Sequence, residues 1–315
     1  MAFEIKPFPE FSWSYSRHKT FASCKRSYYY TYYAGHNGWL RGSSEAQKHA
    51  YRLKKMQTLP LAVGQIVHDI LAKTIQDMYQ NNRHTTAEAL QQRARQLLND
   101  MYKSSIQPGA WFERPSKNPI FQEMYYFKQL DKTLLSYYNG LLLPYFENFF
   151  ARQTMQTITQ QAVTFKQLED FSYMKIDGTK VYVVLDLLYV DESNNWHITD
   201  WKTGKPSTDD REQLMLYAYY VHEHYQVPYA NVQLHLEYLT TQSCETFTVN
   251  EKMLANIFYL FEQSTLHMKG LMADMIENEP LAEEDFDPQP TSGKCMRCNY
   301  LEICDGQDYF PSNFG

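Results

Sequence analysis

The sequence has no long hydrophobic run, and no apolar stretch approaches the roughly 18 residues that a membrane span needs. Residues 1–10 carry two acids and two prolines where a signal peptide would have a basic and then an apolar segment. We therefore expect no signal peptide, no membrane partner and a cytoplasmic location. A Gly-x4-Gly-Lys-Ser/Thr phosphate loop is also missing, which leaves the chain without an obvious nucleotide-driven motor of its own.

Cysteine is scarce and odd in number, which argues against a disulfide framework. Three of the five lie close together as Cys295-x2-Cys298-x5-Cys304, and a fourth metal ligand would come from Cys24 or Cys244. A structural zinc site commonly uses two paired knuckles, and only one Cys-x2-Cys pair is present. The irregular spacing favours a four-thiolate iron–sulfur cluster, with zinc as the alternative.

The residues that are plentiful point to a folded protein of one large domain or two modest ones. Of 315 residues, 43% are hydrophobic, which is enough for a core and excludes global disorder. The formal net charge of −6 argues against a generic nucleic-acid binder. Residues 1–60, however, hold ten Lys or Arg against three acids, and residues 270–292 hold seven acids and no base. Such asymmetry predicts either a phosphate-binding surface or a solvated basic face.

Tyrosine is abundant, with 26 residues, and five of them fall within residues 28–33, beside Lys25 and Arg26. Tyrosine rings can stack on unpaired bases, and they can also fill a core. Since they cannot all point one way from a helix, we expect a mixture of the two.

The pattern of apolar residues predicts helices first and strands later. We expect helices at 14–34, 60–75, 85–102, 120–138, 142–154, 207–225 and 251–277, and strands at 158–169, 171–176, 179–191, 194–202, 230–240 and 244–249. Residues 104–119 are expected to be a linker, and Thr85-x-x-Glu88 a capping box. The mixed order predicts an α/β fold with a mixed central sheet flanked by helices. The parts would be a helical section 1–80, a helical insertion 81–157, a core 158–278 and an acidic linker with the cysteine cluster 279–315.

The most informative stretch places two acids and a lysine in consecutive strands. Asp186 lies in the apolar run 181–190, and Asp200-Trp201-Lys202 ends the next one. A carboxylate among apolar neighbours costs several kcal/mol, roughly, unless a partner compensates it. A divalent cation held by Asp186 and Asp200 would be such a partner, and Mg²⁺ or Mn²⁺ suits oxygen ligands.

Other polar residues follow this pair in an order that suits phosphodiester hydrolysis. Lys202 is two residues from Asp200, hence on the same sheet face, where it could orient water or stabilise phosphate charge. His68, on the helix that Pro60 opens, could be a third ligand. Gln213 and Tyr217 lie one helical turn apart and could contact the nucleic-acid backbone or support Lys202. Each residue alone has a structural explanation, so the hypothesis depends on their order.

That order resembles the RecB-type branch of the PD-(D/E)XK nuclease superfamily. Gly64 and His68 match its first motif, Asp186 the second, Asp200-Trp201-Lys202 the third, and Gln213 with Tyr217 its Gln-x3-Tyr motif. One N-terminal and three C-terminal cysteines are similar to those of its iron–sulfur members, which include the AddB nuclease domain and the iron–sulfur nucleases of CRISPR adaptation. This likeness implies cluster ligands at Cys24, Cys295, Cys298 and Cys304 and leaves Cys244 over. Leu185 stands where the superfamily's name has proline.

The resemblance implies a restriction-endonuclease-like fold, in which an iron–sulfur clasp joins the two ends of the chain. It implies a Mg²⁺- or Mn²⁺-dependent DNA nuclease, in particular an exonuclease on single strands or DNA ends, with His68, Asp186 and Asp200 on the metal. A separate helicase or a CRISPR-adaptation protein would be the partner, and DNA repair or phage defence the setting. The alternatives are a non-catalytic iron–sulfur subunit that binds nucleic acid, and a redox sensor that uses the cluster.

Overall fold

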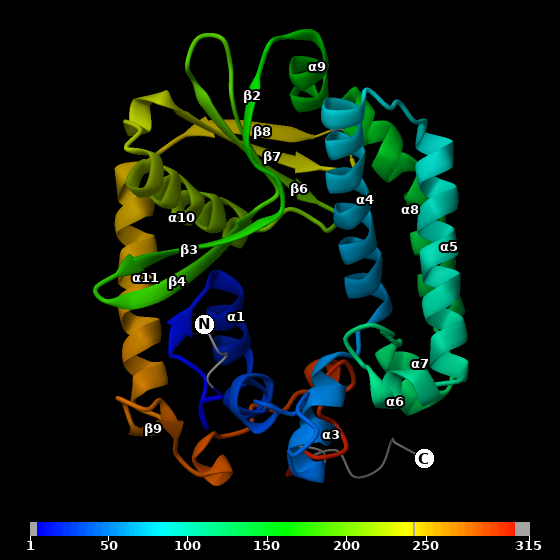
Figure 1. Ribbon diagram of the computed structural model, residues 1–315, viewed down its shortest axis with the longest axis vertical. Coiled ribbons are helices and arrows are strands. Elements are labelled where there is room, and N and C mark those ends of the chain that lie inside the picture. The colour runs from blue at the N-terminus through cyan, green and yellow to red at the C-terminus, as the bar shows by residue number, and fades with distance from the viewer. Residues whose placement is uncertain (1–4, 242, 306–315) are drawn as a thin grey trace. The chain divides into compact units, whose positions relative to one another are not determined.

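The computed structural model describes residues 5–241 and 243–305, which form two compact units (Figure 1). Unit 1 comprises Met1–Leu59, Met101–Leu130 and Glu262–Gly315, and unit 2 comprises Pro60–Asp100 and Asp131–Phe261. The division into four parts drawn from the sequence stays a prediction. Among the described residues, no helix is both long and apolar enough to cross a membrane.

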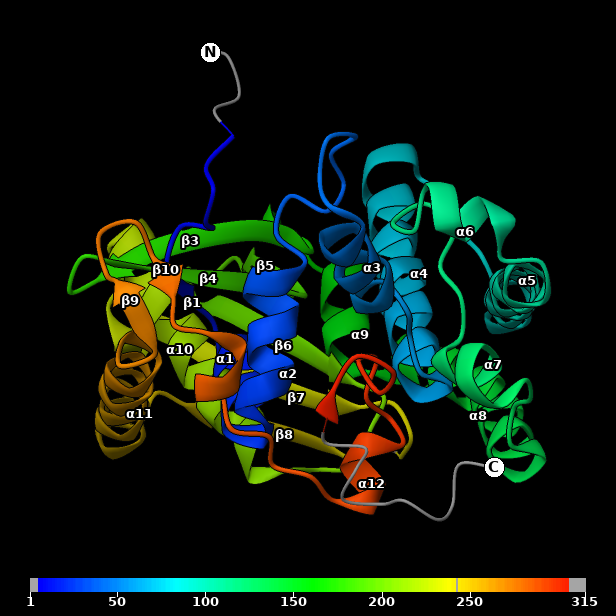
Figure 2. The ribbon, with the colours of Figure 1, turned by 90° about the horizontal axis from the view of Figure 1, so that it is seen from below.

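Unit 2 is built on a five-stranded mixed sheet with strand order β2-β5-β6-β7-β8. Its strands are β2 (Thr164–Gln167), β5 (Leu187–Val190), β6 (Trp196–Lys202), β7 (Val232–Tyr238) and β8 (Cys244–Thr248). Only β6 and β7 run parallel, and the other neighbours are antiparallel. A parallel pair needs a long crossover connection. Helix α10 (Thr208–Tyr225) supplies it and contacts both strands (Figure 2).

A long hairpin lies between β2 and β5 in the chain and determines where one acidic side chain lies. Strands β3 (Asp170–Ile176) and β4 (Thr179–Leu185) pair antiparallel, with Asp170 opposite Leu185. The turn between them contains Gly178 at φ 75°, a conformation that glycine adopts without steric cost. Because the hairpin closes at Gly178, its open end brings the residue before β3 beside the residue after β4.

Helices cover both faces of the sheet in unit 2. Helix α10 begins with a capping box, in which Ser207 and Asp210 bind each other's backbone N–H groups. On the opposite face, the Phe149 ring of α8 lies 5.6 Å from the Trp201 ring, and Thr154 of α9 is 3.3 Å from Thr199. The other helices of this unit are α4 (Leu59–Asn81), α5 (Ala87–Ile106), α8 (Lys132–Ala151), α9 (Gln153–Gln160) and α11 (Glu251–Lys269), of which α5 and α11 continue into unit 1.

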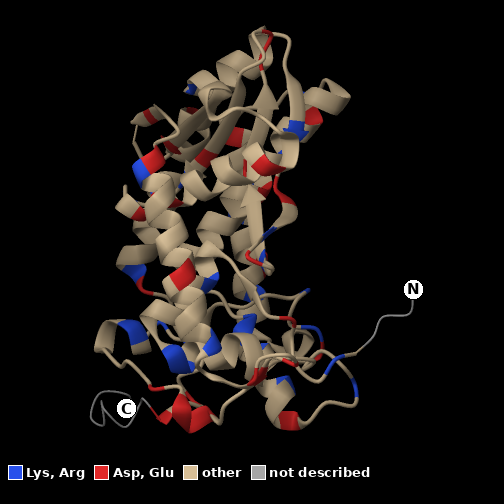
Figure 3. Ribbon diagram, turned by 90° about the vertical axis from the view of Figure 1, so that its left-hand side faces the viewer, with Lys and Arg blue, Asp and Glu red and all other residues tan. Residues whose placement is uncertain are grey.

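Unit 1 joins segments from both ends of the chain. Arg26 pairs with Glu283 and Asp305 at 3.2 and 2.8 Å and donates to the Phe286 carbonyl. Figure 3 shows basic and acidic segments interspersed in the lower part of the ribbon. The acidic stretch therefore neutralises part of the basic N-terminal region. The elements of unit 1 are β1 (Ser12–Trp13), α1 (Tyr15–Ser23), α2 (Lys25–Tyr29), η1 (Tyr30–Ala34), α3 (Glu45–Lys54), α6 (Gly109–Glu113), α7 (Gln122–Phe127), β9 (Met272–Asp274), β10 (Glu279–Pro280), η3 (Glu283–Asp285) and α12 (Ser292–Cys295).

The tyrosine-rich segment is divided between core and surface, as expected. Tyr28, Tyr30 and Tyr33 are buried, whereas Tyr29 and Tyr32 are half-buried. The Tyr29 ring packs 4.9 Å from Phe286, so this segment also contacts the C-terminal part of unit 1. Most of these rings are therefore structural.

The mixed α/β architecture is confirmed, but several expected boundaries are wrong. The N-terminal helix breaks at Cys24, which is extended (φ −165°) and ends α1. Residues 158–160 belong to a helix and not to a strand, and the expected linker 104–119 contains α6. The cap of α5 is Thr86, whose hydroxyl accepts the Ala89 N–H, and not Thr85. Helix α11 ends at Lys269, before Gly270, eight residues short of the expected end.

Candidate active site

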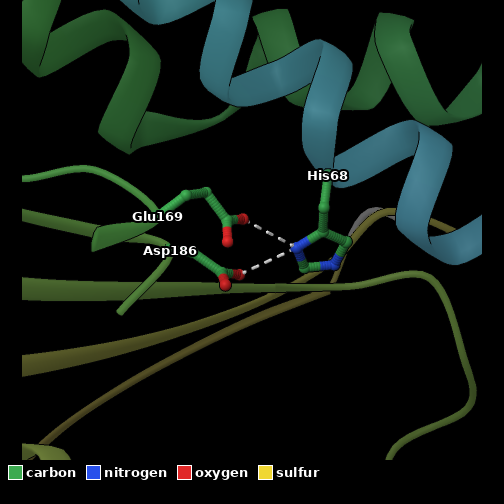
Figure 4. Close-up of side chains that lie close together, drawn as sticks. All are labelled: His68, Glu169 and Asp186. Carbon is green, nitrogen blue, oxygen red and sulfur yellow. Dashed lines mark hydrogen bonds and ion pairs between the residues drawn. The ribbon is translucent and has the colours of Figure 1, made fainter. Parts of the chain in front are cut away.

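One histidine and two carboxylates converge in unit 2 (Figure 4). His68 extends from α4, and its Nδ1 lies 3.3 Å from Glu169 Oε1 and 3.4 Å from Asp186 Oδ2. Each of the three side chains offers a ligand atom within 4.8 Å of the other two. Among the described residues, no other group of three His, Cys, Asp or Glu side chains meets this criterion.

Asp186 lies between the end of β4 and the start of β5, and a backbone hydrogen bond fixes its carboxylate. Its Oδ2 accepts the Trp201 backbone N–H at 2.8 Å, and the residue is only 7% exposed. The sequence predicts Asp186 within one strand, whereas it occupies the break between two. This break frees its side chain for the site while the neighbouring residues Leu185 and Leu187 stay in the core.

Sequence reasoning missed Glu169. It lies in the short bend between β2 and β3 at φ 51°, a conformation uncommon for a residue with a side chain. Its N–H donates to the Leu185 carbonyl at 2.9 Å, because the open end of the β3–β4 hairpin brings it there. No local pattern marks this acid, and only the strand register places it beside Asp186.

Asp200 and Lys202 form a second polar group on the same face of β6. The Lys202 ammonium lies 2.8 Å from Asp200 Oδ2 and donates to Gln213 Oε1 at 3.0 Å. Gln213 in turn donates to the Tyr217 hydroxyl at 2.6 Å. The structure thus connects four of the residues singled out in the sequence. Asp200 itself lies outside the compact group around His68.

Trp201, between these two residues, points to the other face of the sheet. Its indole N–H donates to Glu237 Oε2 at 2.8 Å, and Glu237 is fully buried. Burial raises the pKa of Glu237, while the hydrogen bonds from Thr154 and Trp201 oppose the increase. This buried contact connects β6 to β7 directly behind Asp200 and Lys202.

The first motif residue, Gly64, lets α4 approach the end of β6. A Cβ atom at Gly64 would meet Thr203 Oγ1 at 3.2 Å, tighter than ordinary packing allows. His68 lies one helical turn further along the same helix. The glycine therefore helps to bring the imidazole to the carboxylates.

The electrostatics show that the site favours a cation. Burial and the Asp186 charge raise the pKa of Asp200 from 3.8 to about 7, although Lys202 opposes this. Burial alone would lower the pKa of His68, but Asp186 and Glu169 raise it well above 6.5. Burial likewise works against the charge on Lys202, and Asp200 raises its pKa. Without a metal, bound protons balance the negative charge of this site.

These residues fit a hard divalent cation. The group offers one imidazole nitrogen and carboxylate oxygens from Glu169 and Asp186. Carboxylates suit Mg²⁺ and Mn²⁺, and an imidazole is also a common ligand of transition metals. A cation here would replace the proton that the carboxylates hold on His68.

The cysteines predicted to bind a cluster all belong to unit 1, and Cys244 belongs to unit 2. The Gln289 N–H approaches Cys24 Sγ at 3.5 Å, and Lys294 donates to the Ser23 carbonyl at 3.1 Å. Burial raises the pKa of Cys298 to about 12, and the thiols of Cys304, Cys24 and Cys295 add to the increase. These four thiols are thus close enough to influence one another, but no three have sulfur atoms within 4.8 Å.

Comparison with known families identifies the class of protein. The model of the PD-(D/E)XK nuclease superfamily matches residues 12–305, and the chain belongs to this superfamily. The superfamily comprises nucleases that use divalent metals, so membership implies a metal-dependent nuclease that binds DNA. It also agrees with the mixed sheet flanked by helices described above.

Other comparisons add little. No curated protein is significantly similar to the chain. Among solved structures, "Crystal structure of SSO0001" is 13% identical, with a TM-score of 0.29 and coverage of 58% of this chain and 79% of that chain. A TM-score this low supports no inference about fold or function.

Proposed function

We propose that the chain is a Mg²⁺- or Mn²⁺-dependent deoxyribonuclease, and specifically an exonuclease that acts on single strands or DNA ends. The observation that carries this proposal is the convergence of His68, Glu169 and Asp186 beside the Asp200–Lys202 pair. Burying carboxylates in this way costs free energy of folding unless a cation balances their charge. A non-catalytic DNA-binding subunit would have no use for such a group.

In this proposal the first three residues, together with Asp200, hold the metal. Once bound, a divalent ion would polarise the phosphoryl group and lower the pKa of a bound water. Trp201 N–H keeps the Asp186 carboxylate in place, so that it needs little rearrangement to accept the ion. Asp200 interacts electrostatically with Asp186 and would complete the ligand set.

Lys202 is the proposed catalytic cation. Asp200 and Gln213 hold its ammonium group from two sides, and Asp210 Oδ1 lies 3.7 Å away. Its raised pKa keeps it charged at neutral pH, so it would orient water or stabilise negative charge that develops on the phosphate. Gln213 and Tyr217 would position this lysine and the substrate backbone.

For unit 1 we propose a 4Fe-4S cluster held by Cys24, Cys295, Cys298 and Cys304, with zinc as the alternative. The contacts of Ser23 and Cys24 with residues 289–294 support this, because they bring the first ligand to the C-terminal three. The extended backbone at Cys24 turns its side chain out of the helix. The cluster would fasten the two ends of the chain.

The setting is also a proposal. The proposed partners are a helicase and, on the cysteine pattern, a CRISPR-adaptation protein. DNA repair or phage defence in the cytoplasm would suit such an enzyme.

The decisive experiment digests end-labelled single-stranded and duplex DNA with Mg²⁺, Mn²⁺ or chelator. We expect metal-dependent cleavage that falls by roughly 10²–10⁴-fold in Asp186→Asn and Lys202→Ala. Lys205→Ala, a change of an exposed lysine three residues further on, is the control that retains activity. Unchanged cleavage by the first two variants would disprove the assignment, and DNA binding without cleavage would indicate a non-catalytic subunit.

A further inference from the structure

A cleft of about 560 Å³ in unit 2 begins at the proposed metal site and follows helix α4. One wall is a face of α4, and the other is strand β2 with the bend that follows it. The chain runs in opposite directions along the two walls. Asp69 therefore lies at the same end of the cleft as Glu169, and Tyr79 lies near Phe165 at the other end. From Asp69 to Gln80 the helical wall is about 16 Å long.

The end of the cleft beside the metal site is acidic, and the other end is aromatic. Glu169, whose carboxylate contacts His68, lines the first end together with Asp69 and Asp170. At the other end the Tyr79 and Phe165 rings lie 4.3 Å apart, tilted by 48°. Tyr79 is 58% exposed, which is high for a large ring in contact with another.

Gln167 lines the cleft from the β2 wall. Its amide nitrogen donates to the Tyr220 hydroxyl at 2.7 Å and to the Ser172 hydroxyl at 3.2 Å. The residue is only 8% exposed, so these hydrogen bonds anchor the β2 wall of the cleft to the fold.

Basic and amide groups complete the middle of the cleft. Lys73 and Lys166 stand on opposite walls, and Gln76 and Gln80 lie between Lys73 and the end of α4. The Lys73 ammonium forms an ion pair with Asp77 Oδ1 at 2.9 Å, whereas the Lys166 ammonium lies 5.3 Å from the centre of the Trp196 ring. The order along the cleft is therefore acids, then lysines and amides, then aromatic rings.

We propose that this cleft binds the unpaired nucleotides next to the scissile phosphate, with a base stacked on the Tyr79–Phe165 pair. The substrate assumed here is that of the proposed function, a DNA single strand. Aromatic rings stack on unpaired bases regardless of sequence, and in a duplex the base faces are already covered. The lysines would follow the backbone, and the acidic end would need the metal before it could accept a phosphate.

Binding is tested with a labelled DNA single strand in calcium buffer, measured by fluorescence anisotropy. We expect Tyr79→Ala to weaken binding about tenfold, which is about 1.4 kcal/mol. Tyr79→Phe, which keeps the ring, should bind like the unchanged protein. Tyr259→Ala, which removes another exposed tyrosine of unit 2, should do the same.

A second readout detects stacking itself. A 2-aminopurine placed in the strand should change its fluorescence on binding to the unchanged protein and to Tyr79→Phe, but not to Tyr79→Ala. Circular dichroism of the three proteins should be identical, since Tyr79 is exposed. Equal affinity of Tyr79→Ala and the unchanged protein would overturn the proposal, as would the absence of binding or tighter binding of an RNA strand of the same sequence.

These outcomes separate the cleft from the catalytic assignment. DNA binding is measured in calcium buffer and does not depend on cleavage. A loss of DNA affinity in Tyr79→Ala therefore supports the cleft even if Asp186→Asn still cuts DNA. Conversely, metal-dependent cleavage that Asp186→Asn abolishes, combined with unchanged affinity in Tyr79→Ala, would retain the nuclease and reject the cleft.

Discussion

Glu169 contacts His68 through its carboxylate from the bend between β2 and β3. Its neighbours in the chain give no sign of a metal ligand, since Asp-rich and Glu-rich bends are common on surfaces. The side chain becomes relevant only because β3 and β4 pair in one register, with Asp170 opposite Leu185. By contrast, the order of His68, Asp186 and Asp200-Trp201-Lys202 along the chain, and its resemblance to a known family, already mark these residues in the sequence.

Glu169→Gln should weaken metal binding by roughly 10–100-fold, since it removes a charged group in contact with His68. Isothermal titration of the metal-free protein with Mn²⁺ measures this directly. Glu223→Gln, an exposed change at the end of α10, is the matched control. Equal affinities for the two variants would show that Glu169 takes no part in the metal site.

Asp200 and His68 predict how stability depends on pH. Burial and Asp186 raise the pKa of Asp200 from 3.8 to about 7, so the folded protein binds more protons than the unfolded chain between these values. The free energy of unfolding therefore falls as the pH rises through this window. The raised pKa of His68 acts in the same direction above pH 6.5, because its proton is lost only as the pH passes the folded value.

We expect thermal melts in chelator to show a Tm that decreases from about pH 4 to about pH 7. The corresponding loss in the free energy of unfolding is on the order of 1–4 kcal/mol. Added Mn²⁺ should raise Tm more at neutral than at acidic pH. In Asp200→Asn the slope should be shallower. A Tm that rises across this window in chelator would contradict the electrostatics described here.

At the scale of elements, strand β6 carries Asp200 and Lys202 on one face. On its other face, Trp201 anchors the strand to β7. Trp201→Phe replaces the buried indole with a smaller phenyl ring and removes its N–H, which leaves the buried Glu237 carboxylate without that donor. We expect a loss of about 1–3 kcal/mol in the free energy of unfolding, measured by urea denaturation. Trp39→Phe in unit 1, where the ring is 49% exposed, should change it little. Equal stability of the unchanged protein and Trp201→Phe would remove the anchoring role.

The order of elements was largely predictable, but their ends were not. The start of the helix expected at 207–225 is correct to within one residue, since α10 begins at Thr208 directly after its Ser207 cap. The break at Cys24 has no comparable signal, because residues 15–34 contain no proline or glycine to interrupt a helix. Residues 158–160, expected in a strand, form the end of α9, where the Thr159 hydroxyl donates to the Met155 carbonyl one turn earlier.

For the molecule as a whole, unit 1 depends on contacts between distant parts of the sequence, which no local pattern reveals. Arg26 with Glu283 and Ser23 with Lys294 are examples, separated by about 260 and 270 residues. The cysteine spacing was the one sequence feature that hinted at this closure.

Cys24→Ser tests the proposed cluster. Anaerobically purified protein should contain iron and sulfide and be brown, and the variant should lose both and unfold at a lower temperature, because a bound cluster contributes its binding energy to folding. Cys244→Ser, at an exposed position in unit 2, is the control that keeps them. Zinc without sulfide in the unchanged protein would replace the cluster with a zinc site, and a metal-free unit 1 would reject both.

The three-segment composition of unit 1 also has a consequence during synthesis. Residues up to Leu59 leave the ribosome early, but Glu262 and the residues after it follow only when all of unit 2 has been made. At roughly 5–20 residues per second, the intervening stretch of about 200 residues imposes a wait on the order of 10–40 s. Throughout that time the rings of Tyr28 and Tyr29 lack Phe286, the aromatic neighbour that later packs against them. Nascent chains should therefore need chaperone protection at this early segment, and slow, cool expression should improve the yield.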